Sequence, residues 1–388
     1  MVIDRAGIRG WFLVGLALAV LAAGASAQQV APPKSVDVHT DGSITFRFVD
    51  PNAKAVGLSL DGVAQPMPMQ RDAAAVWSMT TVPLAPEVYG YAFVVDGQPR
   101  LDPQSHAVRP NLAFFSDAVS VPSKPGTPPL PWEATSVPHG VVHHHVFESS
   151  IVKGLPGNRS EFYVYTPPGY DAKADKLYPV LYLLHGWSDL ALGWSEVGLE
   201  PNIMDNLIAQ GKARPMVVVM PLGYGDMSFV RQGFGIWQQD APIRENTKLF
   251  SESLLTEVVP RVEAAYNVSK KAEDRAIAGL SMGGLEGLTI GLNHPEEFDW
   301  VGGFSAAVHR LDHSLDVPNV DEKTSAQRRL LWIACGTEDS LIKPNRALVA
   351  WLKTKDVPVT AVETPGMHTW MVWRDNLIHF APLLFQPK

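Results

Sequence analysis

The spacing of hydrophobic residues along this chain changes once and divides the sequence into two parts. From residue 35 to about residue 121, hydrophobic and polar residues alternate over short runs, and Asp-Gly pairs separate several of these runs. Alternation with a period of two predicts half-buried strands, and Asp-Gly favours the tight turns of β-hairpins. Short strands at even spacing are typical of a β-sandwich of immunoglobulin-like build. We expect strands at residues 43–48, 55–60, 76–80 and 89–95.

Beyond residue 140 the pattern is different, because continuous apolar runs alternate with longer segments of helical period. A strand without polar alternation is expected where both faces of a sheet are covered. Strands that alternate with helices predict a mostly parallel α/β sheet with helices on both faces. The expected strands are 161–165, 180–184, 216–220, 275–278, 301–304, 330–335 and 357–363, and the expected helices are 202–210, 249–266, 283–293, 344–355 and one from about residue 370.

Two segments of biased composition mark the limits of these parts. The stretch 121–132 is rich in proline, which is typical of a semi-rigid linker. Near the start, two arginines precede an apolar run at 11–23, and Ala25-Ser26-Ala27 offers a cleavage site between small residues. This pattern predicts a secretory signal peptide, with a retained membrane anchor as the alternative. The expected organisation is a signal peptide at 1–27, a β-sandwich module at 28–121, a linker at 122–134 and an α/β domain at 135–388.

Composition narrows the partners that this chain is expected to bind. Hydrophobic residues make up 46% of the sequence and charged residues 19%, as in globular proteins with a substantial core. The net charge of -8 argues against nucleic acid and anionic membranes as partners, since both favour a basic face. We therefore expect a secreted or periplasmic protein that does not bind a membrane once its signal peptide is removed.

Neither cysteine nor histidine indicates a metal or a cofactor. Cys335 is the single cysteine, so no intrachain disulfide can form, and its apolar neighbours predict a buried strand residue. His143, His144 and His145 are adjacent, but successive side chains of a strand point to opposite faces. They cannot all reach one ion, and we expect no metal and no cofactor.

The strongest chemical signal is the pentapeptide Gly279-Leu280-Ser281-Met282-Gly283, which follows one expected strand and precedes an expected helix. A serine in a tight strand-to-helix turn needs small residues two positions before and two positions after it, and Gly279 and Gly283 meet that need. The turn also places the hydroxyl at the N-terminal end of a helix, where negative charge is favoured. The pattern predicts a nucleophile elbow with Ser281 as the nucleophile.

The remaining catalytic groups are expected after Ser281, because in an α/β-hydrolase sheet the acid and then the histidine follow the serine along the chain. Two later strands end just before Asp339 and His368, and catalytic groups gather at the carboxyl ends of such strands. We expect His368 as the general base and Asp339 as its partner, with the adjacent Glu338 as the competing acid. The oxyanion hole is expected from the N–H groups of Met282 and Trp187.

Five motifs in this order resemble the esterase-D-type family: Thr-Pro-Pro-Gly-Tyr, Leu-Tyr-Leu-Leu-His-Gly, Gly-Leu-Ser-Met-Gly-Gly, Cys-Gly-Thr-Glu-Asp-Ser-Leu and Gly-Met-His-Thr-Trp. This family includes the feruloyl and acetylxylan esterases of carbohydrate esterase family one, and enterochelin esterases are more distant members. The resemblance covers roughly residues 140–385. It implies a serine esterase that acts on feruloyl or acetyl esters of plant cell-wall polysaccharide.

The preceding strands resemble the early-set modules found before glycogen-branching enzymes and many secreted esterases, and some relatives of such modules bind polysaccharide. Trp77, Tyr89 and Tyr91 are candidates for stacking on sugar, although aromatic residues at alternating strand positions are more often core. Because every expected catalytic group lies beyond the linker, a chain that starts near Ala134 is expected to keep its activity on small esters.

Three readings of function stay open from the sequence. The leading one is the polysaccharide esterase, the second is hydrolysis of a siderophore lactone, and the third is a non-catalytic carbohydrate-binding protein on a hydrolase fold. The aromatic loop at 222–240 is a candidate wall for an aromatic acyl group, or else packs on the sheet. Trp237 in that loop and Trp370 beside the histidine motif are candidate substrate contacts.

Overall fold

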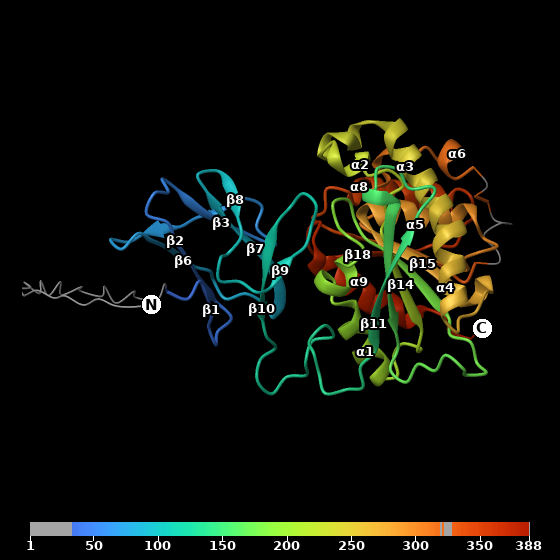
Figure 1. Cartoon of the computed structure of the whole chain (residues 1–388), viewed down its shortest axis with the longest axis horizontal. Coiled ribbons are helices and arrows are strands. Elements are labelled where there is room, and N and C mark those ends of the chain that lie inside the picture. The colour runs from blue at the N-terminus through green and yellow to red at the C-terminus, as the bar shows by residue number, and fades with distance from the viewer. Residues whose placement is uncertain (1–32, 319, 322–327, 388) are drawn as a thin grey trace, which may run out of the picture. The chain divides into compact units, whose positions relative to one another are not determined.

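The N-terminal part of the chain forms two antiparallel sheets in the computed structural model, which describes residues 33–318, 320–321 and 328–387 (Figure 1). The expected signal peptide at 1–27 lies outside the described residues. In order across the first sheet, the strands are β1 (Val36–Val38), β2 (Ile44–Val49), β6 (Val76–Thr80) and β5 (Gln70–Arg71). In the second sheet they are β4 (Met67–Pro68), β3 (Val56–Leu60), β7 (Glu87–Val95), β10 (Ser116–Val121) and β9 (Val108–Arg109), and β8 (Gln98–Arg100) pairs with β7.

The two N-terminal sheets share one hydrophobic core. The ring centroids of Phe46 on β2 and Tyr91 on β7 are 5.0 Å apart, and those of Phe48 on β2 and Phe93 on β7 are 4.7 Å apart. Trp77, Tyr89 and Tyr91 are all buried in this core. Of the two readings of these aromatic residues, core packing is therefore the one that the structure supports.

The second part of the chain contains an eight-stranded mixed sheet, which is mostly parallel. β12 runs antiparallel to both of its neighbours, β11 and β14, and the other neighbouring pairs of this sheet are parallel. In order across the sheet, the strands are β11 (Val141–Glu148), β12 (Arg159–Thr166), β14 (Val217–Pro221), β13 (Val180–Leu184), β15 (Arg275–Leu280), β16 (Trp300–Phe304), β17 (Leu330–Gly336) and β18 (Thr360–Thr364). The expected α/β fold is confirmed, and β13 and β14 are buried along their whole length, as continuous apolar runs predict.

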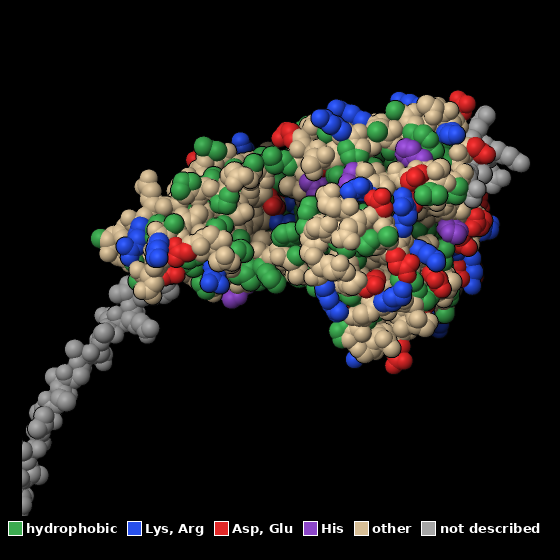
Figure 2. All heavy atoms as spheres, turned by 90° about the horizontal axis from the view of Figure 1, so that it is seen from above, with side chains coloured by type: hydrophobic (Ala, Val, Ile, Leu, Met, Phe, Trp, Pro, Cys, Tyr) green, Lys and Arg blue, Asp and Glu red, His purple; other side chains and the backbone are tan. Residues whose placement is uncertain are grey.

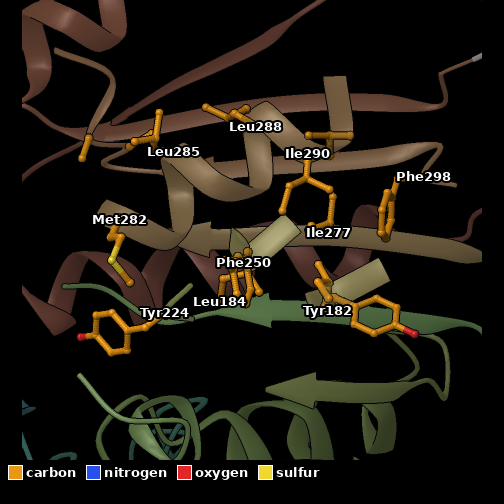
Figure 3. Close-up of a cluster of buried hydrophobic side chains, with 14 of the residues drawn as sticks. Tyr182, Leu184, Tyr224, Phe250, Ile277, Met282, Leu285, Leu288, Ile290 and Phe298 are labelled. Atoms are coloured by element: carbon orange, nitrogen blue, oxygen red, sulfur yellow. The ribbon is translucent and has the colours of Figure 1, made fainter. Parts of the chain in front are cut away.

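Helices cover both faces of this sheet, and successive residues of one strand reach the two cores in turn. On β13, Tyr182 and Leu184 belong to one core, while Leu181 and Leu183 belong to the other. The first core is closed by α3, α4, α5 and α8, and the second by α1 and α9 (Figures 1 and 3). The helices are α1 (Glu200–Ala209), α2 (Ser228–Arg231), α3 (Asp240–Ser253), α4 (Val259–Ala265), α5 (Ser281–Asn293), α6 (His313–Asp316), α8 (Ile342–Lys353) and α9 (Trp370–Phe380).

Two expected boundaries are wrong for identifiable reasons. The helix expected at 249–266 begins at Asp240, because the residues before 249 are mostly polar and show no apolar stripe. That helix also contains a π-helical turn, Leu254–Val258, between α3 and α4. The last strand begins at Thr360 rather than Val357, since Val357 packs into the core after α8 instead of pairing in the sheet.

The proline-rich segment is folded against the rest of the chain. The carboxylate of Glu133 accepts hydrogen bonds from the N–H and hydroxyl of Ser123 and from the N–H of Leu130. Asn206 of α1 donates from its side chain to the carbonyls of Pro131 and Glu133.

On the face shown in Figure 2, hydrophobic side chains are scattered among polar ones and the two signs of charge are intermixed.

Candidate active site

Ser281 lies at the junction of β15 and α5, in a strained turn. Its φ of 51° falls in the left-handed region that residues other than glycine rarely adopt. A side chain on Gly279 would place its Cβ 2.5 Å from the carbonyl oxygen of Gly283, and a Cβ on Gly283 would lie 2.5 Å from the carbonyl oxygen of His185. The turn therefore has no room for a larger residue at position 279 or 283. This is why the Gly-x-Ser-x-Gly motif has glycine at both positions.

Asp339, His368 and Ser281 form one chain of hydrogen bonds. His368 Nδ1 lies 2.8 Å from Asp339 Oδ2, and His368 Nε2 lies 3.0 Å from Ser281 Oγ. Burial raises the pKa of Asp339, but the hydrogen bond and charge of His368 and the N–H of Leu341 outweigh it, so this pKa lies below its ordinary value. The competing acid, Glu338, is exposed, while Asp339 is buried and faces the histidine.

The loops that carry the acid and the histidine are joined to each other. Thr337 and Glu338 donate their N–H groups to the carbonyls of Thr364 and Gly366, at 2.8 and 3.0 Å. A Cβ on Gly336 would lie 2.3 Å from the carbonyl oxygen of Gly366, so the two backbones approach closely only because Gly336 has no side chain. These contacts fix the distance between the ends of β17 and β18.

The expected oxyanion donors lie on two segments that meet at Ser281. Met282 is at the start of α5, where the first N–H groups have no partner within the helix. Trp187 lies in the turn after β13, and among the described residues no backbone hydrogen bond engages its N–H. A Cβ on Gly186 would lie 3.5 Å from the Cβ of Ser281, which shows how closely this turn passes the serine.

His185 supports this turn from below as a neutral side chain. Burial lowers the pKa of His185 to about 4. Its Nδ1 donates to the carbonyl of Gly186 at 2.8 Å, and its Nε2 accepts from the N–H of Gly223 at 2.8 Å. Both ring nitrogens are therefore occupied, which gives His185 a structural role.

A cavity of about 570 Å³ opens at Ser281 and His368. Both candidate substrate contacts, Trp237 and Trp370, line it, but each is nearly buried and packs on other aromatic rings. The rings that line the cavity and are mostly exposed are Phe114, Phe115 and Phe234.

Phe114 and Phe115 were not expected from the sequence, because they lie in the N-terminal part of the chain, between β9 and β10. Two adjacent phenylalanines, followed by the polar Ser116 and Asp117, were the signal available there. Of the aromatic residues expected to wall the cavity from the loop at 222–240, Tyr224 and Phe229 are instead buried in the core.

Of the three adjacent histidines of β11, His143 and His145 both lie edge-on to the ring of Tyr266. His144 stacks on Tyr163, and His145 stacks on Phe162. Within residues 33–318, 320–321 and 328–387, no group of three or more His, Cys, Asp or Glu side chains is placed to hold a metal ion. The same residues include no helix that is long and apolar enough to cross a membrane.

The fold and the arrangement around Ser281 are those of an α/β-hydrolase-like protein. The sequence model of the esterase family, described as "Putative esterase", matches residues 154–384, which is more than half of the chain. The chain therefore belongs to the esterase family, as the motifs indicated.

The curated relatives that match this chain have printed names of three kinds: endo-1,4-beta-xylanase/feruloyl esterase, acetyl esterase and iron(III) enterobactin esterase. The chain is 29% identical over 356 residues to an endo-1,4-beta-xylanase/feruloyl esterase of Xylanibacter ruminicola, a match that covers 90% of this chain and 46% of the relative. This chain thus spans less than half the length of that relative. It is also 30% identical over 138 residues to an iron(III) enterobactin esterase of Escherichia coli O6:H1, covering 34% of each chain.

Solved structures support the fold. The enterobactin esterase FES from Shigella flexneri aligns with a TM-score of 0.65 and 22% identity, over 89% of this chain and 93% of that chain. The ferulic acid esterase AmCE1/Fae1A from Anaeromyces mucronatus aligns with a TM-score of 0.55 and 22% identity, over 65% of this chain and 93% of that chain. At this identity, the likeness bears on the fold alone.

Proposed function

We propose that this protein is a serine carboxylic ester hydrolase that works through an acyl-enzyme. The observation that carries the proposal is the continuous chain of hydrogen bonds from Asp339 through His368 to Ser281, which is set in a strained elbow. Such a chain lets the hydroxyl oxygen attack an ester carbonyl while the imidazole takes its proton. Membership of the esterase family supports the same reaction class.

In the first half of the reaction, Ser281 Oγ bonds to the carbonyl carbon and His368 Nε2 receives the hydroxyl proton. His368 then gives that proton to the departing alcohol as the bond between carbon and the alcohol oxygen breaks. In the second half, a water molecule attacks the carbonyl carbon of the acyl-serine in the same way. The carboxylic acid product leaves, and Ser281 is free again. Asp339 holds the imidazole with its proton on Nδ1 and stabilises the imidazolium that forms in each half.

The oxyanion of each tetrahedral intermediate is proposed to accept hydrogen bonds from the N–H groups of Met282 and Trp187. Donors that are already oriented stabilise the charge as it develops, and the loss of one such donor costs roughly 10²- to 10³-fold in rate. The N-terminal end of α5 adds the favourable field of a helix dipole at the same point.

The substrates we propose are feruloyl or acetyl esters of plant cell-wall polysaccharide. The Xylanibacter ruminicola relative, whose printed name includes feruloyl esterase, matches over 90% of this chain. The exposed rings of Phe114, Phe115 and Phe234 give the cavity an apolar wall that suits a phenolic acyl group. Trp237 and Trp370 are proposed to back this wall, since each lines the cavity with a small exposed fraction.

A second candidate is an esterase for a catecholate siderophore. The observation that favours it is the sequence match to the iron(III) enterobactin esterase of Escherichia coli O6:H1, which is 30% identical to this chain over 138 residues. A catechol ring also suits an aromatic wall. A non-catalytic carbohydrate-binding protein is disfavoured, because a decayed site would be expected to lack one of the three hydrogen-bonded residues.

We propose the remaining organisation from the sequence pattern: export by a signal peptide at 1–27, an early-set immunoglobulin-like module at 28–121, a linker at 122–134 and the catalytic domain at 135–388. Carbohydrate binding by the module is proposed through residues other than Trp77, Tyr89 and Tyr91, because these three are buried.

The test is turnover of methyl ferulate, acetylated xylan and a catecholate siderophore by wild type and by Ser281→Ala. We expect feruloyl or acetyl ester turnover in wild type, labelling of Ser281 by a phosphonate ester, and a loss of turnover of about 10⁴-fold or more in the variant. Turnover that survives in Ser281→Ala would contradict the mechanism. Preference for the siderophore would favour the second candidate.

A further inference from the structure

The turn that carries Trp187 is held by a segment from the N-terminal part of the chain. The amide nitrogen Nδ2 of Asn111 donates to Oδ1 of Asp189 at 2.8 Å, and the N–H of Leu112 donates to the carbonyl of Ser188 at 2.7 Å. Asn111 and Leu112 lie in the connection between β9 and β10, 78 and 76 residues before their partners in sequence. One connection therefore contacts both residues that follow Trp187.

The orientation of the Asn111 amide is fixed at both ends. Its Oδ1 accepts from the N–H groups of Ala113 and Phe114, at 2.9 and 2.8 Å, and its Nδ2 donates to Asp189. A flipped amide would lose all three hydrogen bonds, because the nitrogen would face donors and the oxygen would face a carboxylate. Asn111 is thus pre-organised by its own turn before it meets Asp189.

Asp189 connects Asn111 to the backbone of the turn at residues 186–189, which carries Trp187 and is called the oxyanion turn below. Its side chain is buried, and Oδ2 accepts from the N–H of Gly186 at 3.3 Å. The N–H of Asp189 donates back to the carbonyl of Gly186 at 3.2 Å, which closes the turn. Between them, Ser188 has a φ of 71°, so the turn contains a residue in the left-handed region and needs outside contacts to persist.

We propose that Asn111 is a positioning residue of the esterase site: through Asp189 it holds the turn that directs the Trp187 N–H to the oxyanion. This inference rests on the proposed function, since it gives a role only if Ser281 forms a tetrahedral intermediate. Without the Asn111 amide, the buried Asp189 Oδ1 loses its donor and the carboxylate is free to rotate away from Gly186. The N-terminal part of the chain is then a component of the active site.

The Asn111→Ala variant is the direct test. We expect kcat for a small aryl ester to fall by about 10- to 100-fold, because a displaced oxyanion donor costs up to roughly 10²- to 10³-fold, while KM changes little. The affinity for a trifluoromethyl ketone, whose adduct with Ser281 places an oxyanion in the same position, should fall in parallel. Asn52→Ala is the matched control, because Asn52 is an exposed asparagine in the connection between β2 and β3, which carries none of the contacts to Ser188 and Asp189 described above.

A double variant separates positioning from general destabilisation. The exchange of the pair, Asn111→Asp with Asp189→Asn, keeps an amide facing a carboxylate. It also keeps an acceptor oxygen for the N–H groups of Ala113, Phe114 and Gly186. We expect the exchange to recover at least half of the lost kcat on a logarithmic scale, whereas Asp189→Asn alone should not. Melting temperatures are measured for every variant.

The outcomes are distinguishable. The inference is overturned if Asn111→Ala keeps kcat and ketone affinity within about twofold of wild type, or if its loss follows the melting temperature and the exchange recovers nothing. Phosphonate labelling of wild type at Ser281, measured in parallel, shows whether the proposed function itself holds. Labelled, active wild type with an unaffected Asn111→Ala variant overturns only the role of Asn111, and an unlabelled, inactive wild type overturns both.

Discussion

Arg374 of α9 donates from Nη2 to Oε1 of Glu87 on β7 at 2.8 Å, across 287 residues of sequence. Both side chains are buried, and the guanidinium also donates to the carbonyls of Val197 and Val88, at 2.9 and 2.7 Å. The ion pair therefore joins the N-terminal sheets to the large sheet and its helices, as Asn111 and Asp189 do at the oxyanion turn.

Removing one partner of this pair is expected to be costly. Glu87→Ala leaves the guanidinium of Arg374 buried and without its counter-charge, and the loss of one partner of a buried pair destabilises proteins by about 3–5 kcal/mol. Urea unfolding of wild type and variant measures the difference. The double variant Glu87→Leu with Arg374→Met, which removes both charges, should be more stable than Glu87→Ala, and a single variant within about 1 kcal/mol of wild type would contradict the prediction.

The same contacts change the expectation for a shortened chain. The sequence suggested that a chain starting near Ala134 would keep its activity on small esters, because the catalytic residues all follow it. Truncation would expose Arg374 and remove Asn111 from Asp189, so we now expect a lower melting temperature and a lower kcat on small esters. A truncated chain with the melting temperature and kcat of wild type would show that neither the Glu87–Arg374 pair nor the Asn111–Asp189 hydrogen bond contributes to stability or activity.

The two adjacent candidates for the acid of the proposed triad, Asp339 and Glu338, can be compared directly. Asp339→Asn should favour the wrong tautomer of His368 and lower kcat by roughly 10³- to 10⁴-fold at neutral pH. Glu338→Gln is the matched control, because Glu338 is exposed and adjacent, and it should stay near wild type. Steady-state kinetics on one soluble ester decides the matter, and reversed effects would mean that Glu338 is the acid.

What the sequence predicts well here is determined locally. The space around Gly279 and Gly283 depends on a turn of a few residues, so a short motif is enough to place Ser281. Asp339 and His368 follow from the positions of strand ends, which apolar runs reveal. Glu87 and Asn111 are different, because each acts on a partner that only the three-dimensional fold brings close, and no periodicity connects the two members of either pair.

Burial of Asp189 has a consequence for the pH dependence of stability. Burial raises the pKa of Asp189 to about 7, against the opposing effects of the Asn111 amide, the charge of Arg109, the N–H of Gly186 and the charge of His368. The folded chain thus holds a proton at Asp189 between about pH 4 and pH 7, where the unfolded chain has released it. Since the unfolded state binds fewer protons in this range, the contribution of Asp189 to stability falls as the pH rises and levels off above about pH 7.

The variant Asp189→Asn isolates this effect, because an amide does not titrate. Any fixed cost of placing two amides side by side at Asn111 is the same at every pH and cancels when the pH dependence is compared. The free energy of unfolding of wild type, minus that of the variant, should therefore decrease from pH 4 to pH 8, by up to about 4 kcal/mol for a shift of this size. Urea unfolding at several pH values measures the difference. A difference that does not change with pH would mean that Asp189 titrates alike in the folded and unfolded chains, and a difference that grows with pH would mean that its carboxylate is stabilised in the fold.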